Sequence, residues 1–432
     1  MNTSLHKIGW KTAAAIVVSN MIGTGIFTTL GFQLSDITNT YSIFLLWIIG
    51  GILALFGAFC YAELGAYFKG NGGDYIYLKE TYHPVFGYLV SWISLIIGFS
   101  SPVALAALAM SKYLSVFNDS FGNGFAIGII FLVALSLSFS LKTSSRFHNF
   151  FTFIKIIFIT VLISLGIFIS DSPAGNSLNF DSSWQSEIAL PAFATSLVFV
   201  TYSYTGWNSA SYIAGEIKDV HRNLPKSLIL GTLFVTVSYL LVNFIMLKHA
   251  PVGQLAGKED VTGEAARNML GGSFGKIVNI FIALQLIATI SGYLWVGSRL
   301  TQAFAKENHL WKSLAVTNAK RIPVRAIFAH AGIAAVIILT GSFKEIFVYT
   351  AFILQLFASL SVSTVFFLKK EQRKIFKSSL FYIFPTVFLL FSLYILYFTL
   401  VHNPRESLIG LGIVALGIVL YLLDRRLSKS EN

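Results

Sequence analysis

The sequence predicts an all-α integral membrane protein that crosses the bilayer with twelve helices. Of its 432 residues, 55% are hydrophobic and only 12% are charged, whereas soluble proteins carry about 25% charged residues. The mean hydropathy is +0.72. This composition excludes a soluble enzyme, a disordered chain and a disulfide scaffold. The only cysteine, Cys60, cannot form an intrachain disulfide.

Uncharged stretches define the expected helices in order, because a bilayer core about 30 Å thick needs roughly 20 apolar helical residues. The stretches free of Asp, Glu, Lys and Arg are 12–35, 84–111, 120–141, 156–170, 188–215, 227–247, 277–298, 326–343, 346–368, 378–401 and 407–423. A further stretch, 41–68, is interrupted only by Glu63. The stretch 156–170 is long enough only if its helix begins near Phe147, which places Lys155 inside the membrane.

The basic residues predict the orientation of these helices. The chain has 31 Lys and Arg against 19 Asp and Glu, a net charge of +12. With the N-terminus in the cytoplasm, 23 of the 31 fall on the inner side, seven on the outer side and Lys155 within a helix. This asymmetry predicts cytoplasmic termini in a multi-pass protein of the plasma (inner) membrane. It also explains the charge without a nucleic acid partner. The basic stretch 369–377 is expected to contact anionic lipid headgroups of the bilayer.

No part of the sequence is long and polar enough for a separate soluble domain, so we expect one transmembrane domain over 1–432. The largest outer segments are 170–187 and 250–275, and each has room for short surface helices. The stretch 12–35 is too long and too glycine-interrupted for a cleavable signal peptide.

The first expected helix contains an interruption at Gly23, Thr24 and Gly25. Each mid-helix glycine costs roughly 1 kcal/mol relative to alanine. One interpretation is close helix packing through small residues. The other is an unwound segment whose free amides bind an anion, as helix N-termini do.

A second interruption, at 201–209, favours the unwound interpretation. This segment places hydroxyl residues and Gly206 in the middle of an apolar helix. Paired broken helices at corresponding places indicate an inverted-repeat transporter, with repeats over 1–170 and 188–370 and accessory helices 11 and 12 over 378–424. Amides at 23–25 would bind a carboxylate, and carbonyls near Ile22, Tyr202 and Ser203 an ammonium group. These two groups together point to an α-amino acid.

Lys155 lies roughly 13 Å along its expected helix, since each helical residue adds about 1.5 Å. A charge at that depth is costly and is expected to face the bundle interior, unless the side chain snorkels to the inner interface. We expect the ammonium to stand where a sodium ion would sit in a sodium-coupled relative. Loss of its proton on burial would make a proton the coupled ion.

Six short motifs together resemble the amino acid–polyamine–organocation superfamily, and within it the LAT-type L-amino acid transporters. They are Met21–Phe27, Tyr61–Leu64 with Gly72–Tyr75, Tyr204–Asn208 with Gly215–Glu216, Arg222–Pro225, Gly297–Leu300 and Ala305–Leu310. They cover the first ten expected helices in order. The resemblance implies a LeuT-type 5+5 inverted repeat with discontinuous helices 1 and 6, working by alternating access.

The resemblance also implies roles for particular residues. Gly23, Thr24 and Gly25 would bind the substrate carboxylate, and the backbone near Ile22, Tyr202 and Ser203 its amino group. Thr205, Gly206 and Asn208 complete the implied substrate-binding set, Tyr202 is the implied gate, and Lys155 matches the lysine that replaces sodium.

Some positions depart from the LAT-type pattern. The outer segment 112–122 has no cysteine, so we expect no disulfide-linked heavy chain. Thr205 stands where several members have glycine, and Tyr202 carries a hydroxyl where Phe or Trp is frequent.

Three polar residues near the expected spans have structural interpretations. Glu63 and Glu216 are expected to be solvated or paired with loop Arg and Lys, the alternative being an inner ion-pair network. His330 is expected to be a satisfied packing residue.

The leading hypothesis is a sodium-independent exchanger of neutral L-amino acids, with no cofactor and no metal. Neutral substrates follow by elimination, because the sequence shows neither a further pocket cation nor a pocket carboxylate. The alternatives are a proton-coupled symporter, an amine or polyamine transporter and, more remotely, an intramembrane enzyme or a channel. The sequence specifies no oligomeric state.

Overall fold

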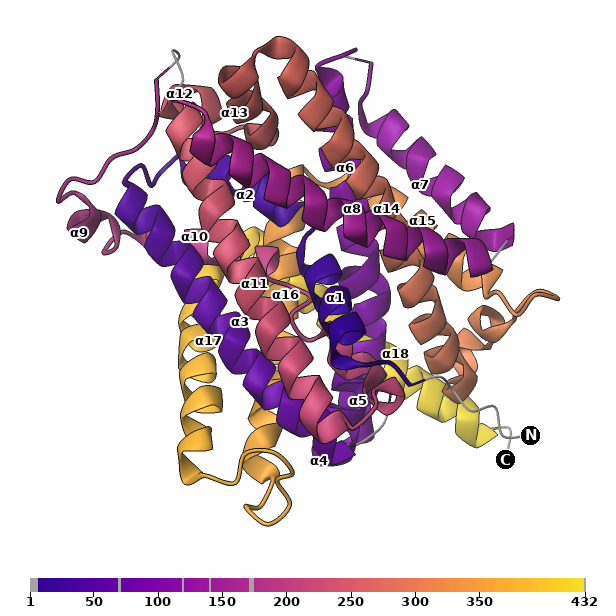
Figure 1. Cartoon of the computed structure of the whole chain (residues 1–432). Coiled ribbons are helices and arrows are strands. Elements are labelled where there is room, and N and C mark those ends of the chain that lie inside the picture. Colours follow the sequence, from indigo (N-terminus) through magenta and orange to yellow (C-terminus); the bar gives the residue numbers. More distant parts are fainter. Residues whose placement is uncertain (1–6, 69–70, 119, 140, 171–174, 431–432) are drawn as a thin grey trace.

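The chain folds into a bundle of long helices that run between two ends of the molecule (Figure 1). This computed structural model describes residues 7–68, 71–118, 120–139, 141–170 and 175–430. Within those residues every regular element is a helix, and the one β-type pairing is an isolated bridge between Ile8 and Ile217. The predicted all-helical class is confirmed. Small parts of the predicted repeats and loops, including 1–6 and 171–174, lie outside the described residues.

The helices follow one another with short connections. In the first part of the chain they are α1 (Trp10–Met21), α2 (Gly25–Gln33), α3 (Thr40–Phe68), α4 (Asp74–Thr81), α5 (Pro84–Ile93), the π-helix η1 (Ser94–Phe99), α6 (Ser100–Ser115), α7 (Asn123–Phe139) and α8 (Leu141–Phe168). Next come α9 (Trp184–Glu187), α10 (Pro191–Ser203), η2 (Ser209–Glu216), α11 (Val220–His249), α12 (Val252–Leu255), α13 (Val261–Leu270), α14 (Gly272–Glu307) and η3 (His309–Ala315). The last are α15 (Val324–Thr340), α16 (Phe343–Ser363), η4 (Thr364–Phe367), η5 (Ser379–Tyr382), α17 (Ile383–His402) and α18 (Pro404–Ser430).

Among the described residues, eight helical stretches are long and apolar enough to cross a membrane, which makes this a multi-pass membrane protein. They are Trp10–Gln33, Thr40–Phe68, Pro84–Ser115, Val220–His249, Gly272–Glu307, Phe343–Phe367, Ile383–His402 and Pro404–Ser428. Three shorter apolar helices accompany them: Asn123–Phe139, Thr152–Phe168 and Val324–Thr340. The predicted stretch 188–215 is divided between α10 and η2, because its helix is interrupted after Ser203.

Glycines on α3 let this helix approach α10, which leads into the second interruption, and α11 closely. A Cβ atom on Gly50 would lie 2.4 Å from Val200 of α10, and one on Gly51 would lie 2.4 Å from Thr236 of α11. In membrane proteins such residues let helix backbones approach closely. The hydroxyl of Tyr204 donates a hydrogen bond to the carbonyl oxygen of Trp47 at 2.9 Å, which fixes the start of the second interruption against α3.

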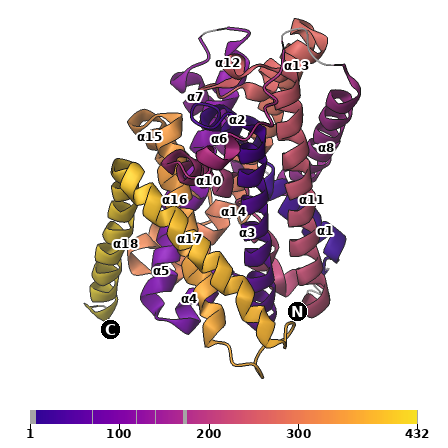
Figure 2. The ribbon, with the colours of Figure 1, turned by 90° about the vertical axis from the view of Figure 1, so that its left-hand side faces the viewer.

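The last two helices lie at the edge of the bundle, where Figure 2 shows α17 and α18 on one flank. Only 28% of the apolar stretch of α17 and 17% of that of α18 is buried inside the protein, compared with 72% of that of Trp10–Gln33. Their exposed side chains are large and apolar, for example Leu393 and Leu408. These faces therefore suit lipid. The segments 170–187 and 250–275 carry the short helices α9, α12 and α13, as the sequence allowed.

Glu63 corrects a prediction, because it is not solvated, and among the residues that the structure describes no basic side chain is paired with it. Its side chain is fully buried. Its carboxylate accepts hydrogen bonds from the backbone N–H groups of Lys374, Ile375 at 3.1 Å and Phe376 at 2.8 Å. The backbone amides of the loop after α16 therefore surround the Glu63 carboxylate on α3. The sequence did not indicate this contact, because the two segments are far apart along the chain.

Replacing Glu63 by glutamine is expected to lower the free energy of unfolding by about 2 kcal/mol, since hydrogen bonds to a charged group contribute about 1.5–3 kcal/mol. Thermal unfolding of the detergent-purified protein measures this loss. The matched control is Glu80→Gln, an exposed carboxylate on α4. Equal melting temperatures for Glu63→Gln and Glu80→Gln would contradict the assigned role.

The structure contradicts the predicted headgroup contact for Arg373 and confirms the prediction for His330. Arg373 of the basic stretch is buried, lies over the rings of Phe381 and Tyr382, and donates to the carbonyl of Ser378 at 2.9 Å. It is therefore not a headgroup contact, whereas Lys369, Lys370, Lys374 and Lys377 are exposed. His330 is confirmed as a satisfied packing residue, fully buried between Ser100 and Thr301 at 2.9 and 3.0 Å.

Candidate functional site

The first interruption begins where α1 ends at Met21 and lasts until α2 begins at Gly25. Ile22 leaves the helix with an extended backbone (φ −75°, ψ 91°). The N–H groups at 23–25 precede or open α2, so no earlier turn supplies their acceptors, and none of them donates to a described backbone carbonyl. A Cβ atom on Gly23 would meet nothing within 4 Å. These amides therefore lie at a helix N-terminus without a described backbone acceptor, a position where an anion binds favourably.

The second interruption touches the first. Gly206 has φ +101°, a conformation that favours glycine, and a Cβ atom there would lie 2.7 Å from the backbone carbon of Asn20. A Cβ atom on Gly25 would lie 2.6 Å from the Cα of Ser203. The two glycines predicted to unwind the helices thus also let the two backbones meet.

Hydroxyl groups tie the two interruptions together. Thr29 and Ser203 share a hydrogen bond of 2.9 Å between their side chains. The hydroxyl of Tyr239 on α11 lies 2.6 Å from the carbonyl oxygen of Met21 and 3.0 Å from that of Ser203. The sequence did not indicate Tyr239, because a single tyrosine in a long apolar helix shows no functional pattern until the position of that helix in the fold is known.

Lys155 on α8 is buried, with 4% of its surface exposed, and faces the bundle interior. Its Nζ donates to the carbonyl oxygen of Ile22 at 2.9 Å and to the Thr289 hydroxyl of α14 at 3.1 Å. A longer contact of 3.5 Å reaches the carbonyl of Ser19. The side chain does not snorkel to an interface. It connects the broken first helix to α14, and the partners described for its ammonium are neutral oxygens.

The carbonyls predicted to bind an ammonium group already accept hydrogen bonds. Ile22 accepts from Lys155, and Ser203 accepts from Tyr239. The carbonyl of Tyr202 accepts from the amide of Thr205 at 2.9 Å and from its hydroxyl at 2.7 Å. Each carbonyl oxygen has two lone pairs, so the carbonyls of Ile22 and Ser203 keep one free position.

Two cavities adjoin at the interruptions. The smaller, about 10 Å³, is lined by Asn20, Met21, Gly23, Thr24, Gly25, Pro102, Tyr202, Ser203, Thr205, Thr289 and Tyr293. The larger, about 430 Å³, shares Tyr202 and Thr205 with it and reaches Ile8, Asp74 and Glu216. Gly206 and Asn208 line the larger cavity, and the Asn208 amide lies 3.5 Å from the Tyr212 hydroxyl. The smaller space holds about one water, so a larger ligand must extend into the larger cavity.

Aromatic side chains close the opposite side of the interruptions. Tyr202 packs on Phe347 with ring centroids 4.1 Å apart. Phe199 continues the cluster, 5.3 Å from Phe347 and 5.6 Å from Phe32 of α2. The larger cavity extends to Ile8, Asp74 and Glu216. Asp74 begins α4, which lies at the same end of the molecule as the end of α18 (Figure 1 and Figure 2).

Asp74 is a buried carboxylate that sequence reasoning missed, although it belongs to a quoted motif. It lines the larger cavity and accepts hydrogen bonds from the hydroxyls of Tyr212, at 2.5 Å, and Tyr61. The pKa of the Asp74 carboxyl is raised, because the effect of burial exceeds the opposite effect of the hydrogen bonds from its neighbours. The premise that the pocket has no carboxylate is therefore wrong, because Asp74 and Glu216 both line this cavity.

A multi-pass helical membrane protein whose paired helix interruptions adjoin a cavity has the features of a membrane transporter. The family model described as amino acid permease matches residues 8–422, and the chain belongs to that family. It is a transporter and not an enzyme.

Several relatives of this chain are amino acid transporters. The b(0,+)-type amino acid transporter 1 of Mus musculus is 28% identical over 98% of this chain and 88% of its own length. The Oryctolagus cuniculus protein of that name is 30% identical over 83% of this chain and 75% of its own length. The Large neutral amino acids transporter small subunit 2 of Mus musculus is 29% identical over 96% of this chain and 80% of its own length.

Proposed function

We propose that this protein is a sodium-independent exchanger of neutral L-amino acids. The observation that carries the proposal is the meeting of two interrupted helices beside the Lys155 ammonium. Free amides at 23–25 suit a carboxylate, and the remaining lone pairs at Ile22 and Ser203 suit an ammonium group. Lys155 occupies the space beside the Ile22 carbonyl with a fixed cation, which removes the need for sodium there.

Neutral side chains fit the larger cavity best. Its lining includes the apolar and aromatic side chains of Ile93, Phe99 and Leu354, together with neutral polar side chains at the interruptions. The carboxylate of Asp74 already accepts hydrogen bonds from two tyrosines, so it is poorly placed to recruit a cationic side chain. Thr205 supplies a neutral hydroxyl at the second interruption. The name of one relative, Large neutral amino acids transporter small subunit 2, agrees with this choice.

The proposal includes an architecture and a sidedness. We place twelve membrane-crossing helices in a LeuT-type arrangement, with repeats over 1–170 and 188–370 and accessory helices over 378–424. The termini are placed in the cytoplasm and the protein in the plasma (inner) membrane, on the basic-residue asymmetry. In this orientation the larger cavity faces the cytoplasm and the aromatic cluster closes the outer side, which is an inward-facing state of alternating access.

A second candidate, proton-coupled symport, is favoured by the neutral surroundings described for the Lys155 ammonium. A buried ammonium without a carboxylate partner is stabilised less than a paired one. It is therefore suited to exchanging a proton during the cycle.

Purified protein in liposomes is expected to accumulate radiolabelled leucine only when unlabelled neutral amino acid is present inside. Replacing sodium by potassium is expected to leave the rate unchanged, because Lys155 already holds the cation position. Uptake that needs an inward proton gradient instead of counter-substrate would establish the symport alternative. Uptake indifferent to both conditions would refute coupled transport, and a panel of twenty competing amino acids would define the side-chain preference.

A further inference from the structure

The segment that leads into α4 is bound to η2, which follows the second interruption. The amide of Gly72 donates to the carbonyl of Tyr212 at 3.0 Å, and the Tyr212 hydroxyl donates to Asp74 at 2.5 Å. The amide of Gly215 donates to the Asn71 side chain at 3.0 Å. Residues 71–74 are therefore attached to η2, and Asp74 is also bound to Tyr61 of α3.

The start of the chain's first helix is bound to the same element. The amide of Ile8 donates to the carbonyl of Glu216 at 2.9 Å, and the amide of Lys218 donates to the carbonyl of Ile8 at 2.9 Å. We call Ile8, residues 71–74 and residues 209–218 the inner block. It joins the inner parts of both interrupted helices through backbone hydrogen bonds.

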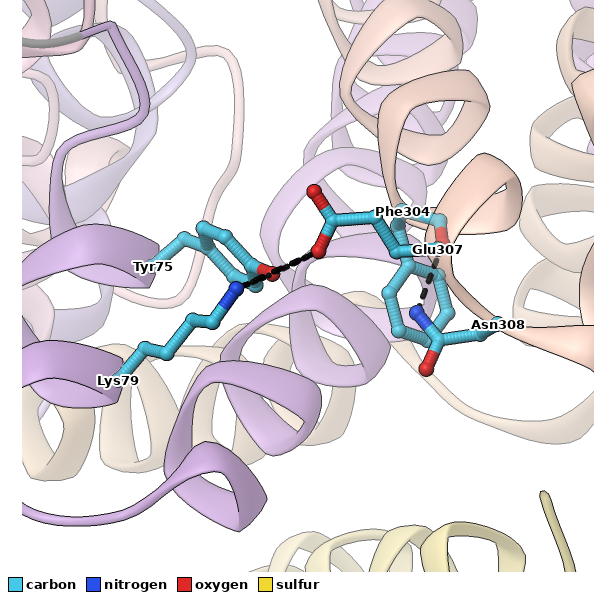
Figure 3. Close-up of polar contacts among 5 residues, drawn as sticks. All are labelled: Tyr75, Lys79, Phe304, Glu307 and Asn308. Carbon is cyan, nitrogen blue, oxygen red and sulfur yellow. Dashed lines mark hydrogen bonds and ion pairs between the residues drawn. The ribbon is translucent and has the colours of Figure 1, made fainter. Parts of the chain in front are cut away.

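The other side of α4 is bound to the end of α14 (Figure 3). The Tyr75 hydroxyl donates to Glu307 Oε2 at 2.5 Å, and Lys79 Nζ lies 3.4 Å from the same oxygen and 3.0 Å from the Tyr75 hydroxyl. Glu307 is the last residue of α14, where a negative charge opposes the helix dipole. The two donors of α4 compensate that charge. The Asn308 amide donates to the carbonyl of Phe304 at 2.7 Å, which closes the same helix end.

The larger cavity lies between these two attachments. Ile8, Asp74 and Glu216 line it from the inner block, and Trp295, Val296 and Leu300 line it from α14. Closing the cavity brings the inner block toward α14. Since α4 is attached to both, we expect the contact of Tyr75 and Lys79 with Glu307 to change when the cavity closes.

We propose that Tyr75, Lys79 and Glu307 form an inner latch that favours the state with the larger cavity open. This inference rests on the proposed function, because it assigns these residues to one state of the transport cycle. The latch residues act through α4 on the inner block and do not contact substrate, so they are positioning residues. The latch is made in the open state and is lost when the cavity closes.

The latch is partly exposed, which limits its strength. The Lys79 side chain is 34% exposed and that of Glu307 is 58% exposed. Exposed ion pairs change an equilibrium by at most about fivefold, so the latch biases the cycle without trapping it. Removing the latch is therefore expected to shift the ligand-free equilibrium between the open and closed states of the cavity by the same factor.

Cysteine accessibility tests the latch, because the only native cysteine is buried. In a Cys60→Ala background, Val296→Cys places a thiol in the larger cavity. Its reaction rate with a maleimide is measured on detergent-purified protein without amino acid. Tyr75→Phe and Glu307→Gln are each expected to lower that rate about threefold to fivefold. The exposed neighbour Lys306→Gln is the matched control and is expected to leave it unchanged.

A charge exchange separates the latch from general damage. Lys79→Glu combined with Glu307→Lys is expected to recover most of the labelling rate that either single change loses. An unchanged rate in Tyr75→Phe and Glu307→Gln, or a faster one, would overturn the latch. The assay uses no substrate, so it stands apart from the liposome experiment: absent exchange in the native protein would refute the proposed function, whatever the labelling shows.

Discussion

Replacing Lys155 by alanine is expected to lower amino acid exchange at least a hundredfold. The ammonium is 4% exposed and binds the Ile22 carbonyl at 2.9 Å and the Thr289 hydroxyl at 3.1 Å. Hydrogen bonds to a charged group contribute about 1.5–3 kcal/mol, and each 1.4 kcal/mol corresponds to a factor of ten. The substitution also leaves a cavity and an unpaired carbonyl at the point where the first helix unwinds.

Exchange in liposomes measures this effect, with thermal unfolding as the check on folding. Lys155→Met keeps the length of the side chain without its charge, so it separates the loss of packing from the loss of hydrogen bonds. Lys226→Ala, an exposed lysine on α11, is the matched control. Full activity of Lys155→Ala together with a pH-independent exchange rate would refute both the sodium-substitute and the proton-coupling roles.

Replacing Gly206 by alanine is expected to reduce exchange by at least a hundredfold through a different cause. At φ +101° a side chain is strained, which costs about 1–3 kcal/mol. The new methyl group would also lie 2.7 and 2.8 Å from the backbone carbon and oxygen of Asn20. Backbone atoms cannot rotate away as a side chain does, so the two interruptions must separate.

The matched control for this substitution is Gly128→Ala on α7, where an added Cβ atom meets nothing within 4 Å. Initial exchange rates and the amount of folded protein after purification are compared for both variants. Wild-type exchange by Gly206→Ala would mean that the close approach of the two interruptions is not needed for transport.

The sequence was sufficient to predict the helical class and the positions of both interruptions. Apolar stretches of bilayer length leave few alternatives to helices. The interruptions are local properties of Gly23, Gly25 and Gly206, whose effect on a helix does not depend on distant residues. For the same reason Lys155 was recognisable, because a charge in an apolar helix is visible without a structure.

The residues that the sequence did not reveal act across long separations. Tyr239 lies 218 residues from its acceptor Met21. The carboxylate of Glu63 meets amides more than 310 residues away. Asp74 was visible in a motif, but its place in the cavity depends on Tyr212 and on how α4 packs. Pairings of this kind follow from helix packing, which local patterns do not encode.

In the orientation proposed above, the contacts between α2 and α10 would limit how the outer side of the protein opens. Gly25 lies against Ser203, the hydroxyls of Thr29 and Ser203 are bonded, and Phe32 stacks on Phe199. These contacts follow one another along the two helices, so the helices cannot tilt independently without losing all three. In the proposed orientation, α2 and α10 would therefore move together when the outer entrance opens.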